Sequence, residues 1–183
     1  VTLHSDTVFD PGPIVLNPNF DAPSCFGLSN GKAYPENISG GNGGYNYLWS
    51  DGQLTDTAFN LGLGSYTLTV TDSKSCSNTM DVDITQPDSL SVIKDSKDLK
   101  CFNDGSGSIE VLSVNNGSAP YDYNWTGPNG YSSSSSTPAI TSLAAGVYVL
   151  SLTDANLCTL NNDSTVILEP DTISVTYVLT QPA

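Results

Sequence analysis

The sequence has no arginine, one histidine and no long hydrophobic run. Five lysines are set against 19 acidic residues, so the formal net charge is −14. Proteins bind nucleic-acid phosphates with clusters of lysine and arginine, so this charge balance excludes a nucleic-acid partner. A helix that spans a membrane needs roughly 20 apolar residues, and no such run is present, so we expect no direct membrane insertion.

The sequence also has few groups that could perform catalysis. Its only histidine, His4, lies near the start of the chain, and no serine–histidine pair recurs with the rest of the pattern. The acidic residues are scattered among turn-forming segments instead of standing as a defined pair. We therefore expect a protein that is not an enzyme and that carries no cofactor.

In place of a catalytic motif, the chain presents nearly the same pattern twice. The matched landmarks are Cys25 and Cys101, Trp49 and Trp125, Tyr66 and Tyr148, and Cys76 and Cys158. The first two pairs share one offset in sequence number (101 − 25 = 76 and 125 − 49 = 76). The last two share a larger one (148 − 66 = 82 and 158 − 76 = 82). One structural unit is thus used twice, with a six-residue insertion in the second copy.

Prolines mark the boundaries of the two copies. Pro11, Pro87 and Pro170 each open a similar stretch, which predicts repeats at residues 11–86 and 87–169. Residues 1–10 resemble the end of the second copy, and residues 170–183 resemble the start of one. We expect these flanks to be the last strand of a preceding repeat and the first strand of a following repeat. The expected partners are accordingly neighbouring repeats of the same chain.

Strand patterns dominate both copies. Residues 65–71 and 147–153 alternate between apolar and polar side chains, which is typical of half-buried strands. Turn-forming clusters such as residues 39–44 separate the strands, and no pattern predicts a helix of eleven or more residues. Many short strands, a tryptophan and two cysteines per copy predict an all-β chain of tandem immunoglobulin-like β-sandwich repeats.

The cysteines suggest a disulfide inside each repeat. Four cysteines allow three pairings, and because each copy must fold alike we expect Cys25–Cys76 and Cys101–Cys158. Domains this small often need such a crosslink for stability. The close cysteine and histidine spacing of a zinc site is absent. Disulfides indicate an oxidising compartment outside the cytoplasm.

The aromatic segments allow two interpretations. In residues 45–49 and 121–125 both tyrosines and the tryptophan occupy alternate positions, so they share one face of a strand. That face lies either in the core or on a platform for sugars. For the second case the candidate carbohydrate contacts are Trp49, Trp125 and Tyr131.

Two aspartates recur after the tyrosine-containing strand. Asp72 and Asp154 are either turn residues that cap the backbone or calcium ligands. The acidic residues at the predicted joints form a second calcium candidate set. They are Asp10, Asp88, Glu169 and Asp171.

Taken together, the ordered features resemble the SprB repeat. These are a cysteine, a glycine-rich turn, Tyr-x-Tyr-x-Trp, Gly-x-Tyr, Thr-Asp, a second cysteine and a closing Gln-Pro or Glu-Pro. The family is found in very large surface adhesins of Bacteroidetes, including those of gliding motility. Two features depart from its pattern: residues 73–75 stand where a glycine is common, and the serine run at 132–136 is inserted.

The resemblance implies a stalk or filament segment of a secreted, repetitive adhesin at the bacterial cell surface. That adhesin would be exported by the type IX system and would take part in surface attachment and gliding. Its external partner would be an extracellular polysaccharide or a surface. The alternative functions are a carbohydrate-binding module, or an accessory region of a secreted enzyme whose catalytic domain lies elsewhere.

The resemblance also implies O-glycosylation at an aspartate followed by serine or threonine and a small or aliphatic residue. The candidate acceptors are Thr7, Thr57, Ser89, Ser164 and Thr172. The alternative is that Asp-Ser and Asp-Thr are common turn dipeptides that match by chance.

Overall fold

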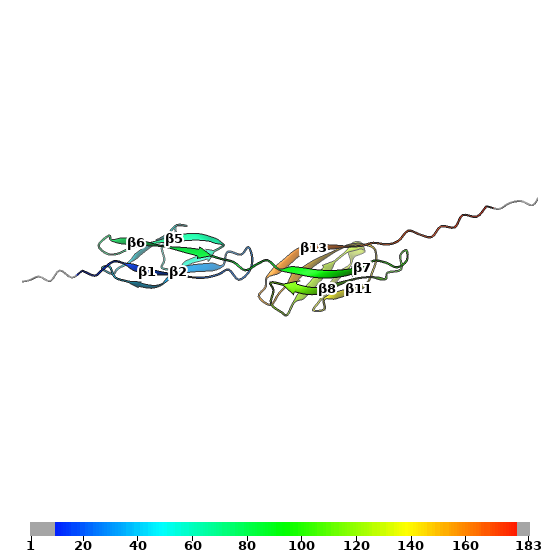
Figure 1. Cartoon of the computed structure of the whole chain (residues 1–183), viewed down its shortest axis with the longest axis horizontal. Coiled ribbons are helices and arrows are strands. Elements are labelled where there is room, and N and C mark those ends of the chain that lie inside the picture. Colours follow the sequence, from blue (N-terminus) through cyan, green and yellow to red (C-terminus); the bar gives the residue numbers. More distant parts are fainter. Residues whose placement is uncertain (1–9, 179–183) are drawn as a thin grey trace, which may run out of the picture. The chain divides into compact units, whose positions relative to one another are not determined.

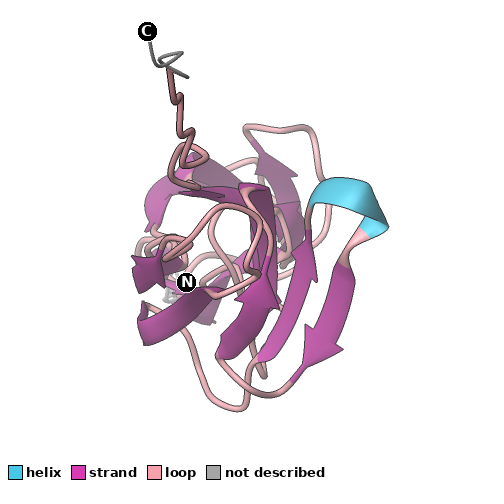
Figure 2. Ribbon diagram, turned by 90° about the vertical axis from the view of Figure 1, so that its right-hand side faces the viewer, coloured by secondary structure: helices cyan, strands magenta, loops and turns pink. Residues whose placement is uncertain are grey.

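The structure, a computed structural model, describes residues 10–178, and strands dominate this range (Figure 1). The chain divides into two compact units, Val1–Asp88 and Ser89–Ala183, called here the first and the second repeat. One short 3-10 helix, η1 (Pro128–Gly130), is the only helix among the described residues (Figure 2).

Within its described residues, the first repeat has six strands in two antiparallel sheets. One sheet has the order β1-β2-β4 and the other β3-β5-β6. The strands are β1 (Val15–Asp21), β2 (Gly31–Ser39), β3 (Asn46–Trp49), β4 (Ala58–Leu61), β5 (Gly64–Thr71) and β6 (Ser77–Ile84).

The second repeat has the same plan with one strand more among its described residues. Its sheets have the orders β11-β8-β7 and β10-β9-β12-β13. The strands are β7 (Ser91–Lys97), β8 (Gly107–Asn115), β9 (Asp122–Thr126), β10 (Ser132–Ser135), β11 (Ala139–Leu143), β12 (Gly146–Thr153) and β13 (Thr159–Ile167). The extra strand β10 comes from the inserted serine run and pairs with the edge of β9. The all-β prediction is confirmed, and each repeat pairs two antiparallel sheets around a hydrophobic core of its own.

Alternating side chains build both sandwiches. In β5, Leu68 and Val70 are buried, and in β12 Tyr148, Leu150 and Leu152 are buried, with more exposed residues between them. Each strand therefore gives one face to the core and the other to water, as the sequence pattern predicts.

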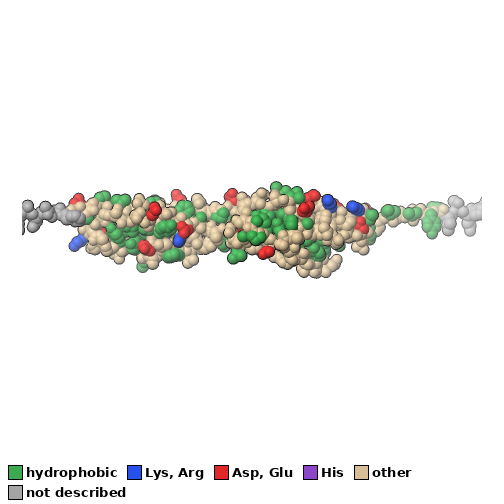
Figure 3. Space-filling view, turned by 90° about the horizontal axis from the view of Figure 1, so that it is seen from below, with side chains coloured by type: hydrophobic (Ala, Val, Ile, Leu, Met, Phe, Trp, Pro, Cys, Tyr) green, Lys and Arg blue, Asp and Glu red, His purple; other side chains and the backbone are tan. Residues whose placement is uncertain are grey.

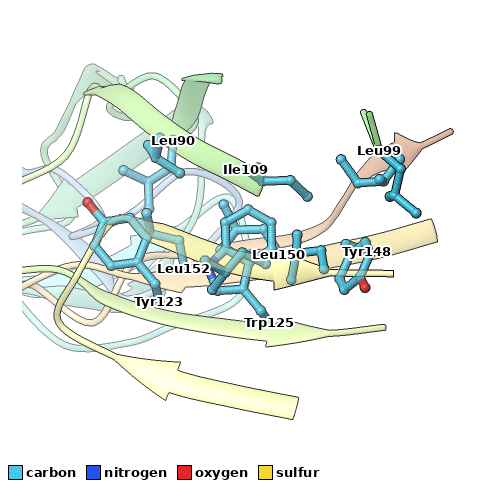
Figure 4. Close-up of a cluster of buried hydrophobic side chains, with 12 residues drawn as sticks. Leu90, Leu99, Ile109, Tyr123, Trp125, Tyr148, Leu150 and Leu152 are labelled. Carbon is cyan, nitrogen blue, oxygen red and sulfur yellow. The ribbon is translucent and has the colours of Figure 1, made fainter. Parts of the chain in front are cut away.

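A tryptophan lies in the core of each repeat. Trp49 and Trp125 are each 1% exposed. In the second repeat, Trp125 and Leu150 come from one sheet, and Leu90 and Ile109 pack on the same cluster from the other side (Figure 4). Truncating so large a buried ring typically costs about 3–5 kcal/mol of unfolding free energy. The core interpretation of the aromatic segments thus holds for both tryptophans.

Each sandwich has two ends, which matter for the cysteines. We call the end where β1 or β7 begins the entrance end, and the end where β6 or β13 finishes the exit end. In the first repeat, the register of β5 on β6 shows which strand ends lie together. β5 starts opposite Ile84 at the exit end and finishes opposite Ser77 at the entrance end. The second repeat matches, because β12 starts opposite Ile167 and finishes opposite Thr159.

Neither predicted flanking strand is observed within the described residues. Residues 170–178 form no strand in the structure, and residues 1–9 lie outside the described residues. That both flanks complete strands of neighbouring repeats stays a prediction.

Candidate functional site

At the entrance end of the first repeat, a buried aspartate organises the turn that carries Cys76. Asp72 is 2% exposed and follows β5 directly. Its Oδ1 accepts hydrogen bonds from the backbone N–H groups of Lys74 (2.8 Å) and Cys76 (2.9 Å). Its Oδ2 accepts from the backbone and side-chain nitrogens of Asn42, at 2.8 and 2.9 Å. Asp72 therefore ties the β5–β6 turn to the loop between β2 and β3.

The second repeat has the same arrangement around Asp154. Its Oδ1 accepts from the backbone N–H groups of Asn156 (2.9 Å) and Cys158 (2.8 Å), and its Oδ2 accepts from that of Ser118 (3.0 Å). In both repeats the backbone of the entrance-end cysteine is thus held by a carboxylate four positions earlier in the chain. The repeated Asp-x-x-x-Cys spacing is the sequence signal for this turn.

Hydrogen bonding sets the ionisation of both carboxylates. Hydrogen bonds from the side chain and backbone of Asn42, with those from Cys76 and Lys74, lower the pKa of Asp72 to about 2. Burial raises the pKa of Asp154, but hydrogen bonds from the Ser118, Cys158 and Asn156 backbones outweigh burial, so its pKa is lowered. Donors to the charged form favour ionisation, so both groups are carboxylates at neutral pH.

This geometry favours the turn role of the two aspartates over the calcium role. A carboxylate has about four lone-pair sites, and four N–H donors already point at those of Asp72. Residues 10–178 also contain no group of three or more histidine, cysteine, aspartate or glutamate side chains placed to hold a metal ion. Calcium at Asp72, Asp154 or the joint residues stays a prediction.

At the exit end, a loop carries the first cysteine and is closed by a side chain from the end of the repeat. In the first repeat the Gly27 N–H donates to Gln86 Oε1 at 3.0 Å. In the second, the Asn103 N–H donates to Glu169 Oε2 at 3.3 Å. Gly27 and Asn103 are equivalent (103 − 27 = 76) and both have positive φ. The Gln-Pro and Glu-Pro motifs therefore close the exit end, a role that sequence reasoning did not assign to them.

The prediction of one disulfide inside each repeat is wrong. Cys25 and Cys158 are disulfide-bonded, and Cys76 and Cys101 are free thiols with exposed side chains. The chain thus holds one disulfide, Cys25–Cys158, and not one per repeat.

Strand direction explains why the predicted pairs do not form. Cys25 follows β1 at the exit end, whereas Cys76 follows β5 at the entrance end. The eight residues of β5 span about 26 Å between these ends. A disulfide needs Cα atoms within about 7 Å of each other. The same opposition separates Cys101 from Cys158 across β12.

The candidate sugar contacts are not presented as a platform. Trp49 and Trp125 are buried, so the structure does not support stacking of a sugar on either ring. Tyr131 is half-buried and packs edge-on against Tyr148, with ring centroids 5.3 Å apart. Its role as a sugar contact stays a prediction.

The candidate glycosylation sites differ in access. The side chains of Ser89, Ser164 and Thr172 are exposed, that of Thr57 is half-buried, and Thr7 lies outside the described residues. Modification of these residues stays a prediction.

The molecular surface offers no basic cluster on the face shown in Figure 3, where the few lysines lie among acidic and polar side chains. Two lysines are ion-paired: Lys32 with Asp21 at 2.9 Å, and Lys94 with Asp163 at 2.8 Å. Within residues 10–178 no helix has the length and apolar character needed to cross a membrane.

The likeness to solved structures is weak. A two-domain fibronectin type III segment of chicken tenascin has a TM-score of 0.32 and 10% identity, covering 83% of this chain and 97% of that one. Murine CEACAM1b has a TM-score of 0.31 and 15% identity, covering 86% and 93%. No curated protein matches the sequence.

A protein-family model matches two stretches of the chain. The SprB repeat model matches residues 19–54 and 93–130. Each match begins in or near the first strand of a sandwich and continues past its core tryptophan. The ends of the two matches differ by the offset that the first landmarks set (130 − 54 = 76). The resemblance recognised in the sequence is thus confirmed, and the chain contains two SprB repeats, one in each sandwich.

Proposed function

We propose that this chain is a segment of the stalk or filament of a large, secreted and repetitive adhesin that serves surface attachment and gliding motility. The observation that carries the proposal is the tandem pair of SprB repeats, each folded as a sandwich around one tryptophan. SprB repeats and a disulfide suggest a surface or extracellular protein, and the sandwich domains suggest a non-catalytic one.

The proposed mechanism is mechanical. Antiparallel sandwiches bury their aromatic side chains and leave polar faces outside, so each repeat acts as a spacer. Repeats in series would carry a binding end away from the cell, and many such molecules on one cell would give avidity toward a polysaccharide or another surface. Export by the type IX system and glycosylation at Ser89, Ser164 and Thr172 belong to the same proposal.

The test uses living cells of the source bacterium. Antibodies against residues 11–169 should label intact cells, and attachment to glass under flow should weaken step by step as pairs of repeats are deleted in frame. A control deletes the same length from a domain that contains no repeat. Labelling that needs permeabilised cells, or attachment that ignores the number of repeats, would contradict the proposal.

A further inference from the structure

We propose that the two free cysteines, Cys76 and Cys101, are disulfide sites for adjacent repeats. Cys76 would bond the exit-end cysteine of a preceding repeat, and Cys101 the entrance-end cysteine of a following one. In a longer array every disulfide would then join consecutive repeats, and none would lie inside a repeat. The inference rests on the proposed function to the extent that it needs such an array.

The first support is the placement of the cysteines within each repeat. Each repeat has one cysteine at its exit end, Cys25 or Cys101, and one at its entrance end, Cys76 or Cys158. The span of the sandwich prevents these two from bonding to each other. A disulfide at either cysteine therefore requires a partner outside its own repeat.

The second support is which cysteines are bonded. The bonded pair consists of the exit-end cysteine of the first repeat and the entrance-end cysteine of the second. The free pair consists of the entrance-end cysteine of the first repeat and the exit-end cysteine of the second. Equivalent residues are thus disulfide-bonded in one repeat and free in the other, and a bond of the same kind at the free ones would need a further repeat on the other side.

The surroundings of the free thiols fit the same role. Cys76 is exposed and lines an open hollow of about 530 Å³ with Ile14 and Asp72. Cys101 is exposed and lines one of about 380 Å³ with Phe102 and Ile173. Phe102 is 53% exposed, and its equivalent Phe26, beside the bonded Cys25, is 57% exposed. Each free cysteine therefore has open space and apolar surface beside it.

The turn at Asp72 prepares Cys76 for this bond. The Asp72 carboxylate fixes the backbone of Cys76 as the Asp154 carboxylate fixes that of the bonded Cys158. Both turns also have the same hydrogen bond from the aspartate N–H to the cysteine carbonyl, at 2.8 and 3.0 Å. The free cysteine is thus held in the same backbone turn as its bonded equivalent.

The bond would form by thiol–disulfide exchange with oxidised glutathione as the oxidant. The Cys101 thiolate attacks one sulfur of glutathione disulfide and releases one glutathione thiolate. The Cys76 thiolate of the next repeat then attacks the Cys101 sulfur of the mixed disulfide and releases the second. The two protein thiols lose two protons and two electrons, and glutathione disulfide is reduced to two glutathione molecules.

The test is a longer chain in which a second copy of residues 11–183 follows Glu169 directly, so that the repeat register is kept. After refolding in a glutathione buffer at low concentration, the monomer is digested without reduction and its linked peptides are identified by mass spectrometry. We expect a Cys76–Cys101 peptide in the longer chain that is absent from the original chain. Changing Cys101→Ser in the first copy alone should remove that peptide and leave Cys25–Cys158 in place.

Two outcomes would overturn the inference. In one, Cys76 and Cys101 of the longer chain remain fully open to alkylation. In the other, they pair as Cys76–Cys76 or Cys101–Cys101. Either result would leave the proposed adhesive function intact, because that function is tested by surface labelling and attachment. Failure of the inference and failure of the function are therefore distinguishable.

Discussion

At the scale of single residues, the two buried aspartates organise the entrance-end turns of their repeats. Asp72 accepts four hydrogen bonds from two loops, and Asp154 accepts three from equivalent positions. Their charge is satisfied by N–H groups instead of by a basic side chain. Stability of the entrance end should therefore depend on the carboxylate form.

The pKa of Asp72 predicts how the first repeat responds to acid. Because the folded state lowers this pKa to about 2, below the value near 3.9 of an unfolded chain, ionisation stabilises the fold above about pH 4. That stabilisation should be lost progressively as the pH falls toward 2. Denaturant unfolding of the first repeat, measured from pH 6 to pH 2, checks this.

The matched variants for this measurement are Asp72→Asn and Asp56→Asn. Asp72→Asn should lower the unfolding midpoint at pH 6 and remove part of the decline in acid. Asp56→Asn changes an exposed carboxylate by the same atoms and should do neither. Equal behaviour of the two variants would show that the Asp72 network does not stabilise the turn.

The two core tryptophans predict a difference between the repeats. Trp49 Nε1 donates to the Thr55 carbonyl at 3.0 Å, whereas Trp125 Nε1 has no partner among the described residues. Trp49→Phe removes a hydrogen bond as well as ring volume, so it should cost about 1 kcal/mol more than Trp125→Phe. Hydrogen exchange of β5 and β12 amides, followed by mass spectrometry, reports each repeat separately. Equal losses of unfolding free energy in the two variants would show that the Trp49 hydrogen bond does not stabilise the first repeat.

At the scale of elements, β10 is the main structural difference between the repeats. It is an edge strand of four serines that pairs with β9, and the first repeat has no described counterpart. The inserted residues therefore extend a sheet that is already complete without them.

Deleting residues 132–137 should leave the second repeat folded. The first repeat shows that the sandwich needs no strand at this edge, so we expect a loss of less than about 1 kcal/mol of unfolding free energy. Denaturant unfolding monitored by Trp125 fluorescence measures the loss. The control deletes the equally long segment 138–143, which removes the buried Ile140 and Leu143, and should unfold the repeat. Unfolding by the first deletion would mean that β10 is essential.

The sequence predicted elements better than it predicted connections. Alternation placed Leu68, Val70, Leu150 and Leu152 on buried faces, because burial follows directly from apolar side chains at period two. The predicted cysteine pairing was wrong because the number of residues between two cysteines does not show at which end of the sandwich each of them lies. β1 runs from the entrance end to the exit end and β5 runs back, so Cys25 and Cys76 lie at opposite ends of the first repeat. For the same reason the sequence did not show that the side chains of Gln86 and Glu169 close the exit ends of their repeats.

At the scale of the whole molecule, the Cys25–Cys158 bond decides which part of the chain can be extended by force. The bond bypasses the whole stretch between its two cysteines, so this stretch cannot lengthen when the termini are pulled while the bond is intact. An array joined in this way throughout would unfold without long extension. This behaviour would suit the stalk proposed above, which would transmit force from a surface to a cell.

Single-molecule pulling of the chain, oxidised and then reduced, tests this account most directly. Reduction should release the hidden chain between Cys25 and Cys158 as one added length of about 450 Å, at roughly 3.4 Å per residue. Disulfides inside the repeats would instead hide the two shorter stretches 25–76 and 101–158. They would give two separate added lengths of about 170 and 190 Å. One long release supports a stalk whose repeats are covalently joined, and two short releases contradict it.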